Sequence, residues 1–327
     1  MRVLITGAAG FIGYHTAATY LDAGAEVIGV DALSDYYDPE LKRARLDRLA
    51  KHDGFTFHHA QIEDEGVMDR LAQDAGIVIH LAAQAGVRYS IDVPESYVTA
   101  NLLGTFRVLE AARAHATPHL LLASTSSVYG ANRELPFRET AKTDMPMSFY
   151  AATKKAGEAM AHSYSHLYGI PMTALRFFTV YGPWGRPDMA LFKFTRAMLA
   201  GEEIEVYGEG NMSRDFSYVD DIVTAIRGLA DVPPETGAAH LSSELAPYRV
   251  VNIGNESPVK LMDFISALER ALGTPAKKRM LPLQPGDMVR TWSDTSRLKA
   301  LTGLAPQTPV DTGVARFVQW YRDYYEV

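Results

Sequence analysis

The sequence predicts an α/β protein in which a doubly wound parallel sheet carries a smaller C-terminal α/β lobe. Three observations predict it. Short apolar runs alternate with helical patterns over the first half of the chain, a glycine-rich turn directly follows the first run, and prolines and glycines become denser after about residue 177. The length of 327 residues is large for one compact domain and sufficient for two lobes.

Short apolar runs between helical patterns predict buried parallel strands. Six such runs are Val3–Ile5, Val27–Val30, Phe55–His58, Val78–Leu81, Leu120–Ala123 and Met172–Arg176. The helical stretches between them include Tyr14–Ala23, Glu40–Lys51, Glu95–Ala116 and Ser148–Tyr168. Strands joined by helical crossovers indicate a doubly wound sheet.

The chain divides near residue 176 on this pattern. Residues 1–176 are expected to form the sheet domain, and residues 177–327 mainly a second lobe, with segments around 210–250 returning to the first domain. In the second half, Ser257-Pro258 predicts a helix towards Leu272, with the serine as cap and the proline in the first turn. A last amphipathic helix is expected at Thr312–Tyr324.

The composition excludes several classes of partner. The net charge is −7, which argues against duplex nucleic acid or an anionic membrane, so an anionic ligand would need a local cluster of arginines. The absence of cysteine excludes disulfides, thiolate chemistry and Cys-ligated zinc, and we expect no metal site. We find no stretch near 18 consecutive apolar residues and no signal peptide before Arg2, and therefore expect a soluble, cytoplasmic protein.

The first thirteen residues read as a strand, the glycine-rich turn Gly7-x-x-Gly10-x-x-Gly13 and a helix. Glycines there let the backbone N–H groups approach a pyrophosphate at the helix N-terminus. Asp31 ends the next strand, where a carboxylate binds the adenosine ribose and repels a 2′-phosphate, so NAD is favoured over NADP. This is the pattern of a Rossmann dinucleotide site.

The wider glycine spacing resembles that of short-chain dehydrogenases, and the small residues after His80 support this. His80 itself is expected to be a packed strand residue. The residues expected to contact NAD are Gly7, Gly10, Phe11, Ile12, Gly13, Asp31, Ile62, Leu81, Ala82 and Ala83, with Tyr150 and Lys154.

A catalytic set is predicted from the spacing of Thr125, Tyr150 and Lys154. Tyr150 and Lys154 lie four residues apart and therefore share one helix face. Removing a hydride from a carbinol carbon needs a base for the hydroxyl proton, and a phenol with a pKa near 10 needs a neighbouring ammonium to serve as one. Lys154 would supply it and hold the nicotinamide ribose, while Thr125 would bond the reacting oxygen.

With these motifs, the chain resembles the extended short-chain dehydrogenase/reductases over nearly its whole length, and within them the UDP-glucuronate 4-epimerases. The supporting stretches are Asp35–Asp38, Leu41–Leu46, Gln84–Ser90, Arg176–Met189, Arg214–Asp221 and Gln284–Asp287. Gln61 departs from the family pattern, which usually carries Asp before Ile62 at the adenine.

The resemblance implies a UDP-sugar substrate. It places Arg214 and Arg290 on the pyrophosphate and Asp287 on the uridine ribose, and it counts Arg88 among the substrate-binding residues. A uronic acid adds a carboxylate, for which the candidate partners are Ser126, Ser127, Thr179 and Arg186.

The serine pair also bears on the outcome of the reaction. The family's sugar dehydratases usually carry Asp-Glu where Ser126-Ser127 stand, and its UDP-glucuronate decarboxylases usually carry Glu at Ser127. This chain has neither acidic pattern, which favours 4-epimerisation of UDP-glucuronate to UDP-galacturonate. The reaction would proceed by C4 oxidation, rotation of the 4-keto sugar and re-reduction, with a tightly bound NAD that is regenerated each turnover. The alternatives are a UDP-glucose/UDP-galactose (or N-acetyl) 4-epimerase, a UDP-glucuronate decarboxylase and a non-catalytic NAD-binding regulator.

The helical stretches Glu95–Ala116 and Ser148–Tyr168 have broad apolar faces, which could pack in the core or pair across a dimer. The resemblance favours a homodimer through a four-helix bundle.

Overall fold

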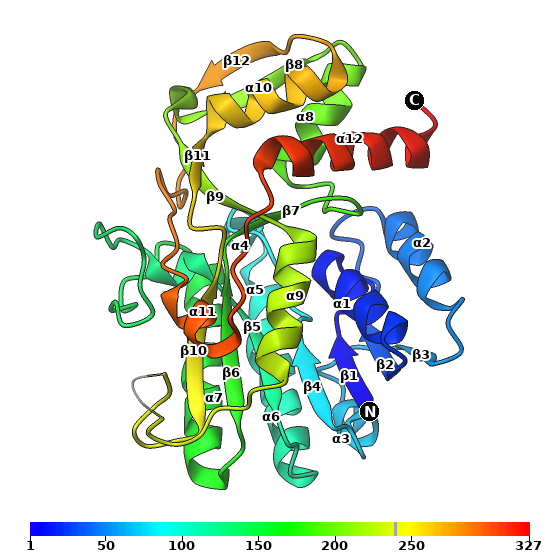
Figure 1. Cartoon of the computed structure of the whole chain (residues 1–327), viewed down its shortest axis with the longest axis vertical. Coiled ribbons are helices and arrows are strands. Elements are labelled where there is room, and N and C mark those ends of the chain that lie inside the picture. The colour runs from blue at the N-terminus through cyan, green and yellow to red at the C-terminus, as the bar shows by residue number, and fades with distance from the viewer. Residues whose placement is uncertain (239–240) are drawn as a thin grey trace.

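The computed structural model describes residues 1–238 and 241–327, and its centre is a seven-stranded parallel sheet (Figure 1). The strand order is β10-β6-β5-β4-β1-β2-β3. The strands are β1 (Arg2–Thr6), β2 (Glu26–Asp31), β3 (Phe55–His59), β4 (Ile77–His80), β5 (Leu120–Thr125), β6 (Met172–Phe177) and β10 (Tyr248–Ile253). The six predicted strands and the doubly wound sheet are confirmed, and β10 extends the sheet beside β6.

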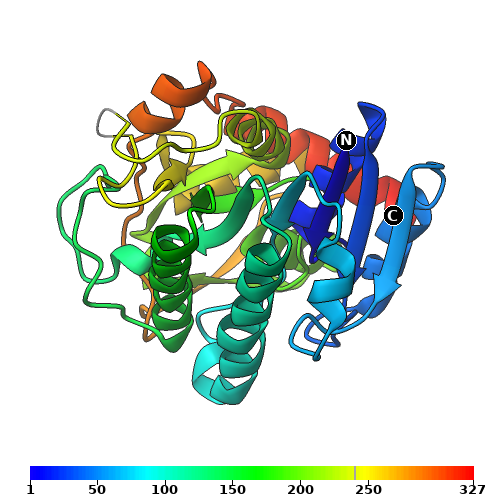
Figure 2. The same ribbon diagram turned by 90° about the horizontal axis from the view of Figure 1, so that it is seen from below.

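The alternation of side chains along the strands explains how helices cover both faces of the sheet. In β1, Val3 and Ile5 belong to one buried apolar cluster and Leu4 to another on the opposite face. Helices α1 (Phe11–Asp22) and α9 (Val219–Ala230) pack on the first face, and α3 (Val67–Ala72), α6 (Gly104–Ala114) and α7 (Phe149–Tyr168) pack on the second. Figure 2 shows α6 and α7 side by side below the sheet.

Local capping residues fix where two of the predicted helices begin. Asp38 caps α2 (Pro39–Leu49) by accepting a hydrogen bond of 2.9 Å from the Glu40 N–H. Ser148 caps α7 by accepting 3.1 Å from the Ala151 N–H, and Gly169 ends the helix in the left-handed conformation. The start of α7 sets the height of Tyr150 above the sheet.

The predicted single helix at Glu95–Ala116 is corrected by the structure. It is divided into α5 (Pro94–Tyr97), a π-helical segment η1 (Val98–Leu103) and α6. The wide turn carries buried Asn101, whose side chain accepts 2.8 Å from the Gln84 N–H and donates 3.1 Å to both the Gln84 carbonyl and Thr153 Oγ1. The irregularity therefore ties the loop after β4 to α7.

The second lobe lies over the carboxyl ends of the sheet strands (Figure 1). It contains a three-stranded sheet, order β11-β9-β7, and a parallel pair β8–β12. Phe216 and Phe264 stack at 4.0 Å in its core. Its strands and helices are β7 (Thr179–Tyr181), α8 (Ala190–Leu199), β8 (Glu203–Tyr207), β9 (Ser213–Tyr218), β11 (Pro258–Lys260), α10 (Leu261–Leu272), β12 (Lys277–Leu281) and α12 (Val310–Tyr325). The chain also contains the short helices α4 (Tyr89–Asp92), η2 (Ser126–Tyr129), η3 (Gly208–Gly210) and α11 (Ser296–Thr302).

The helix predicted from Ser257 begins later than expected. Residues 258–260 pair antiparallel with β9, Val259 opposite Arg214, and α10 starts only at Leu261, after Lys260 and without a side-chain cap. Strand pairing therefore outweighs the local Ser-Pro signal. The last predicted helix, at Thr312–Tyr324, is confirmed as α12. Across residues 1–238 and 241–327, no helix has the length and apolar character needed to cross a membrane.

Candidate active site

The glycine-rich turn between β1 and α1 is shaped by close backbone approach. Gly7 has φ +72°, and a Cβ on Gly13 would lie 2.0 Å from the Gly7 carbonyl oxygen. Gly10 caps α1 without a side-chain hydrogen bond, and the first turn holds no acidic residue. The N-terminus of α1 is therefore suited to an anionic group.

Asp31 lies at the end of β2 with its carboxylate held by the neighbouring backbone. Oδ2 accepts 3.1 Å from the Ala9 N–H, and Oδ1 accepts 2.8 Å from the Leu33 N–H. These bonds fix the side chain beside the glycine-rich turn. A fixed carboxylate there suits the two hydroxyls of an adenosine ribose and disfavours a phosphate at the same place.

One cavity of about 690 Å³ runs from this turn to the catalytic helix. All residues predicted to bind the cofactor line it, and Gln61 lies beside Ile62 on its wall. These lining residues are Gly7, Gly10, Phe11, Ile12, Gly13, Asp31, Ile62, Leu81, Ala82, Ala83, Tyr150 and Lys154. The anion-binding turn, the ribose carboxylate and the apolar strand ends fit a dinucleotide along this cavity. His80 does not line it and is buried between Thr6 and Thr105, at 2.8 and 3.1 Å.

The three predicted catalytic residues line the same cavity, and Tyr150 is hydrogen-bonded to Thr125. Thr125 ends β5, while Tyr150 and Lys154 come from the first turns of α7. Burial raises the pKa of Tyr150, and the charge of Arg186 and a hydrogen bond with Thr125 oppose this rise. Burial lowers the pKa of Lys154 to about 8, and the negative charge of Glu158 opposes it.

Arg45 supports the wall of the site, and the sequence analysis quoted it only as part of a motif. It is fully buried, and it donates 2.8 Å to the Ala9 carbonyl, 2.9 Å to the Tyr37 hydroxyl and 2.6 Å to the Trp184 carbonyl. It therefore joins the glycine-rich turn to α2 and to the second lobe. Ala9 and Trp184 are distant from it in sequence, so no local spacing identifies these two contacts.

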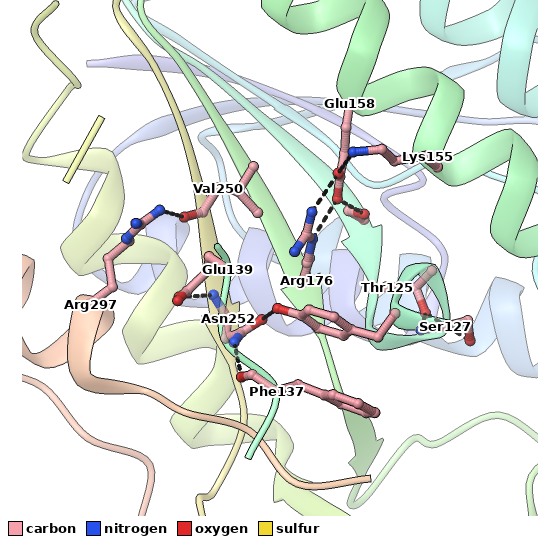
Figure 3. Close-up of polar contacts among 12 residues, drawn as sticks. Thr125, Ser127, Phe137, Glu139, Lys155, Glu158, Arg176, Val250, Asn252 and Arg297 are labelled. Atoms are coloured by element: carbon pink, nitrogen blue, oxygen red, sulfur yellow. Dashed lines mark hydrogen bonds and ion pairs between the residues drawn. The ribbon is translucent and has the colours of Figure 1, made fainter. Parts of the chain in front are cut away.

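The serine pair directly follows Thr125 in η2. Thr125 Oγ1 accepts 3.2 Å from the Ser127 N–H and donates 3.3 Å to Ser127 Oγ (Figure 3). Ser126 is buried. The chain thus presents hydroxyls, without a carboxylate, beside the catalytic threonine.

Thr179 and Arg186 line a small pocket next to the main cavity, and Arg186 lines both. The guanidinium is already paired: Nε and Nη2 donate to the two carboxylate oxygens of Asp188 at 3.0 and 2.6 Å. Tyr36 donates a further 3.0 Å bond to Asp188. Asp188 and Tyr36, which the sequence analysis quoted only as parts of motifs, therefore fix the direction of Arg186.

The other four predicted substrate residues form a separate group, in which Arg88 comes from the loop after β4 and the other three come from the second lobe. Arg88 and Asp287 form an ion pair of 3.3 Å. Arg214 donates 3.1 Å to the Val289 carbonyl; burial lowers its pKa and the charge of Asp287 opposes this. Arg290 lies in a bridge with Ser213, next to Arg214. These four residues do not line the main cavity, and the Asp287 carboxylate there pairs with Arg88 and acts on the charge of Arg214.

The fold and the candidate site are those of the short-chain dehydrogenase/reductases, a class of NAD-dependent enzymes. The model of the NAD dependent epimerase/dehydratase family matches residues 3–254. The chain belongs to this family, and NAD is its cofactor.

The chain is similar to several relatives along almost its full length. A Rhizobium meliloti protein named "Probable UDP-glucuronate 4-epimerase" is 52% identical, over 99% of this chain and 98% of the relative. UDP-glucuronate 4-epimerase 3 of Arabidopsis thaliana is 45% identical, over 99% of this chain and 77% of the relative. The crystal structure of the Bacillus cereus UDP-glucuronic acid 4-epimerase with UDP-glucuronic acid and NAD has a TM-score of 0.90 at 33% identity, covering 99% of this chain and 100% of that one.

Proposed function

We propose that this enzyme interconverts UDP-glucuronate and UDP-galacturonate by 4-epimerisation. The observation that carries the proposal is the placement of Ser126 and Ser127 directly after Thr125, beside an intact Tyr150 and Lys154. A 4-epimerase needs the oxidising set without the acid and base of a dehydratase. The relatives named as UDP-glucuronate 4-epimerases support the choice of substrate.

The residues of the site fit a reversible proton transfer. Tyr150 as phenolate takes the proton of the C4 hydroxyl, and Lys154 stabilises the phenolate with its positive charge. Thr125 hydrogen-bonds the same oxygen. NAD, when bound, accepts the C4 hydride and returns it to the opposite face after the sugar has turned. Tyr150 then gives the proton back, which restores the hydroxyl with inverted configuration.

The substrate carboxylate has to be held while C4 is a ketone, because a β-keto acid loses CO₂ when the breaking bond aligns with the carbonyl π system. Ser126, Ser127 and Thr179 supply hydroxyl donors, and Arg186 supplies a cation that Asp188 keeps in one orientation. We assign to this group the retention of the carboxylate near the plane of the C4 carbonyl. Arg88, Arg214, Asp287 and Arg290 are assigned to the UDP moiety.

The second candidate is a 4-epimerase of neutral UDP-hexoses. The Thermotoga maritima UDP-glucose 4-epimerase with UDP-glucose has a TM-score of 0.86 at 29% identity, covering 99% of this chain. A carboxylate can accept hydrogen bonds from the hydroxyls of Ser126 and Ser127 through two charged oxygens, whereas a neutral hydroxymethyl group offers one uncharged oxygen. That difference favours the uronic acid.

We further propose that the enzyme is a cytoplasmic homodimer. Large apolar side chains are exposed along η1, α6 and α7, as expected for helices that pair with those of a second copy. These side chains are Val98, Leu103, Phe106, Phe149, Leu167 and Tyr168.

The substrate proposal is tested by giving the purified enzyme UDP-glucuronate and UDP-glucose separately and resolving the products by chromatography. We expect UDP-galacturonate from the first, with a kcat/KM at least about tenfold above that for UDP-glucose. A higher kcat/KM for UDP-glucose would favour the second candidate, and UDP-pentose as the main product would indicate a decarboxylase.

A further inference from the structure

A buried carboxylate, Glu158, lies one helical step beyond the catalytic residues of α7. Tyr150, Lys154 and Glu158 follow one another at four-residue intervals, so their side chains leave the helix on neighbouring turns of one face. Glu158 forms an ion pair with Arg176 of β6: Nε lies 2.8 Å from Oε1 and Nη2 lies 2.8 Å from Oε2 (Figure 3). Both side chains are 2% exposed.

The same carboxylate is bonded to the strand that carries Thr125. Ser124 Oγ donates to Glu158 Oε1 at 2.6 Å, and Ser124 and Arg176 are register partners in the adjacent strands β5 and β6. One carboxylate therefore binds side chains from two neighbouring strands. It fixes the catalytic helix over the sheet at the residue that immediately precedes Thr125.

Arg176 continues the network towards the serine pair. Its guanidinium carbon lies 4.8 Å from the centre of the Tyr129 ring, the last residue of η2. Tyr129 stacks on Phe137 at 4.5 Å and donates 2.6 Å to Asn252 Oδ1 of β10. The segment that contains Ser126 and Ser127 is thus held at its end by the partner of Glu158.

Glu158 also acts on Lys154 through its charge, which opposes the lowering of the Lys154 pKa by burial. The groups that face this region are Tyr150 and Glu158 on α7, His80 at the end of β4, and Arg176 on β6, which is paired with Glu158. Burial lowers the pKa of His80 to about 3, so this ring is neutral. Burial alone would raise the pKa of Glu158, but hydrogen bonding and charge from Arg176 outweigh it and keep the carboxylate ionised.

We propose that Glu158 is a positioning residue for the C4 oxidation: its ionised carboxylate lies one helical step beyond Lys154 on α7, and its bonds to Ser124 and Arg176 fix Thr125 and the catalytic helix over β5 and β6. The proposal rests on the proposed function, since it concerns proton transfer at the sugar C4 hydroxyl. Fixing Thr125 through Ser124 needs only side chains that can form the same hydrogen bonds. An effect on the charge of Lys154 needs the negative charge of Glu158, so variants can separate the two roles.

The first test is Glu158→Gln, which preserves an acceptor for Ser124 and removes the charge. We expect kcat for UDP-glucuronate to fall at least about tenfold with KM within about twofold. In the kcat–pH profile, the fall of kcat at high pH (the alkaline limb) should move to lower pH by roughly one unit, because Lys154 loses its proton more easily. The NAD released on denaturation, measured by absorbance and mass, should equal that of the wild type.

Two further variants keep the test decisive if Glu158→Gln folds poorly with Arg176 left unpaired. Glu158→Gln/Arg176→Met removes both buried charges, and we expect it to retain NAD and still show the lowered alkaline limb. Ser124→Ala removes only the hydroxyl that bonds Glu158. It should lower kcat severalfold and leave the alkaline limb of the kcat–pH profile unchanged. Lys155→Gln, which removes the half-exposed partner of Glu158 at 3.3 Å, is the matched control and should stay within about twofold of wild type.

The outcomes separate the proposal from the proposed function. Wild-type kcat and pH profile in Glu158→Gln, or their restoration in the double variant, would overturn the role of Glu158. If neither charge variant folds, wild-type kcat in Ser124→Ala overturns it. A wild-type enzyme that does not convert UDP-glucuronate at all would instead contradict the proposed function.

Discussion

At the scale of single residues, Tyr150 depends on its neighbours to act as a base. Burial raises the pKa of this phenol, so an isolated tyrosine at the same place would stay protonated at neutral pH. The charge of Arg186 and a hydrogen bond with Thr125 oppose this rise, and Lys154 lies four residues along α7. The chemistry therefore belongs to the group and not to the tyrosine alone.

Replacing Tyr150 by Phe should lower kcat by about 10³-fold or more, because no other group is placed to take the C4 hydroxyl proton. The variant should keep its fold and its NAD, since the phenyl ring preserves the packing against Tyr97 at 6.1 Å. Product formation and released nucleotide, measured on the same preparation, check both parts. Activity near that of the wild type would instead indicate a role outside proton transfer.

The pKa of Lys154 sets an upper pH limit for the enzyme. Lys154 loses its charge as pH rises through about 8, and the proposed phenolate then loses the cation one helical turn along α7. We expect kcat/KM for UDP-glucuronate to decline above that pH. Initial rates between pH 6 and pH 10, at constant ionic strength, measure the limb; a rate that keeps rising to pH 10 would contradict the assignment.

Arg186 is predicted to prevent loss of CO₂ from the keto intermediate. Arg186→His shortens the side chain and leaves Asp188 without its bidentate partner, so the carboxylate of the sugar is no longer held in the ring plane. We expect UDP-pentose among the products, detected by mass spectrometry. Weaker binding without pentose would assign Arg186 to affinity alone.

At the scale of elements, the N-terminus of α7 sets the position of the catalytic face. The Ser148 cap at 3.1 Å from the Ala151 N–H stabilises the turn that carries Tyr150. Ser148→Ala should cost about 1 kcal/mol. In a chain of this length we expect a fall in Tm of about 1–2 °C, with NAD still bound, in a thermal unfolding scan.

The elements also show how far the sequence determines the site. Buried parallel strands leave continuous apolar runs, so six strands and the glycine-rich turn can be predicted from local pattern. The Glu158–Arg176 pair cannot, because its partners meet only where α7 packs on β6. The same reason explains the late start of α10: Val259 is held by β9, and a local Ser-Pro signal contains nothing about that pairing.

At the scale of the whole molecule, the exposed apolar side chains of η1, α6 and α7 predict a second copy on this face. The mass in solution should be about twice the 36.0 kDa of the chain. Leu103→Asp, at a side chain that is 41% exposed, should shift it towards the monomer. Light scattering after size exclusion measures both proteins. A wild-type protein with the mass of a monomer would contradict this prediction.

The central claim is that one bound NAD carries the C4 hydrogen out of UDP-glucuronate and back to its other face. The most direct measurement uses UDP-glucuronate deuterated at C4, with no NAD added, and follows the product by proton NMR and mass spectrometry. The account predicts UDP-galacturonate that keeps the deuterium at C4. Product with hydrogen from solvent at C4, or no epimer at all, would contradict it.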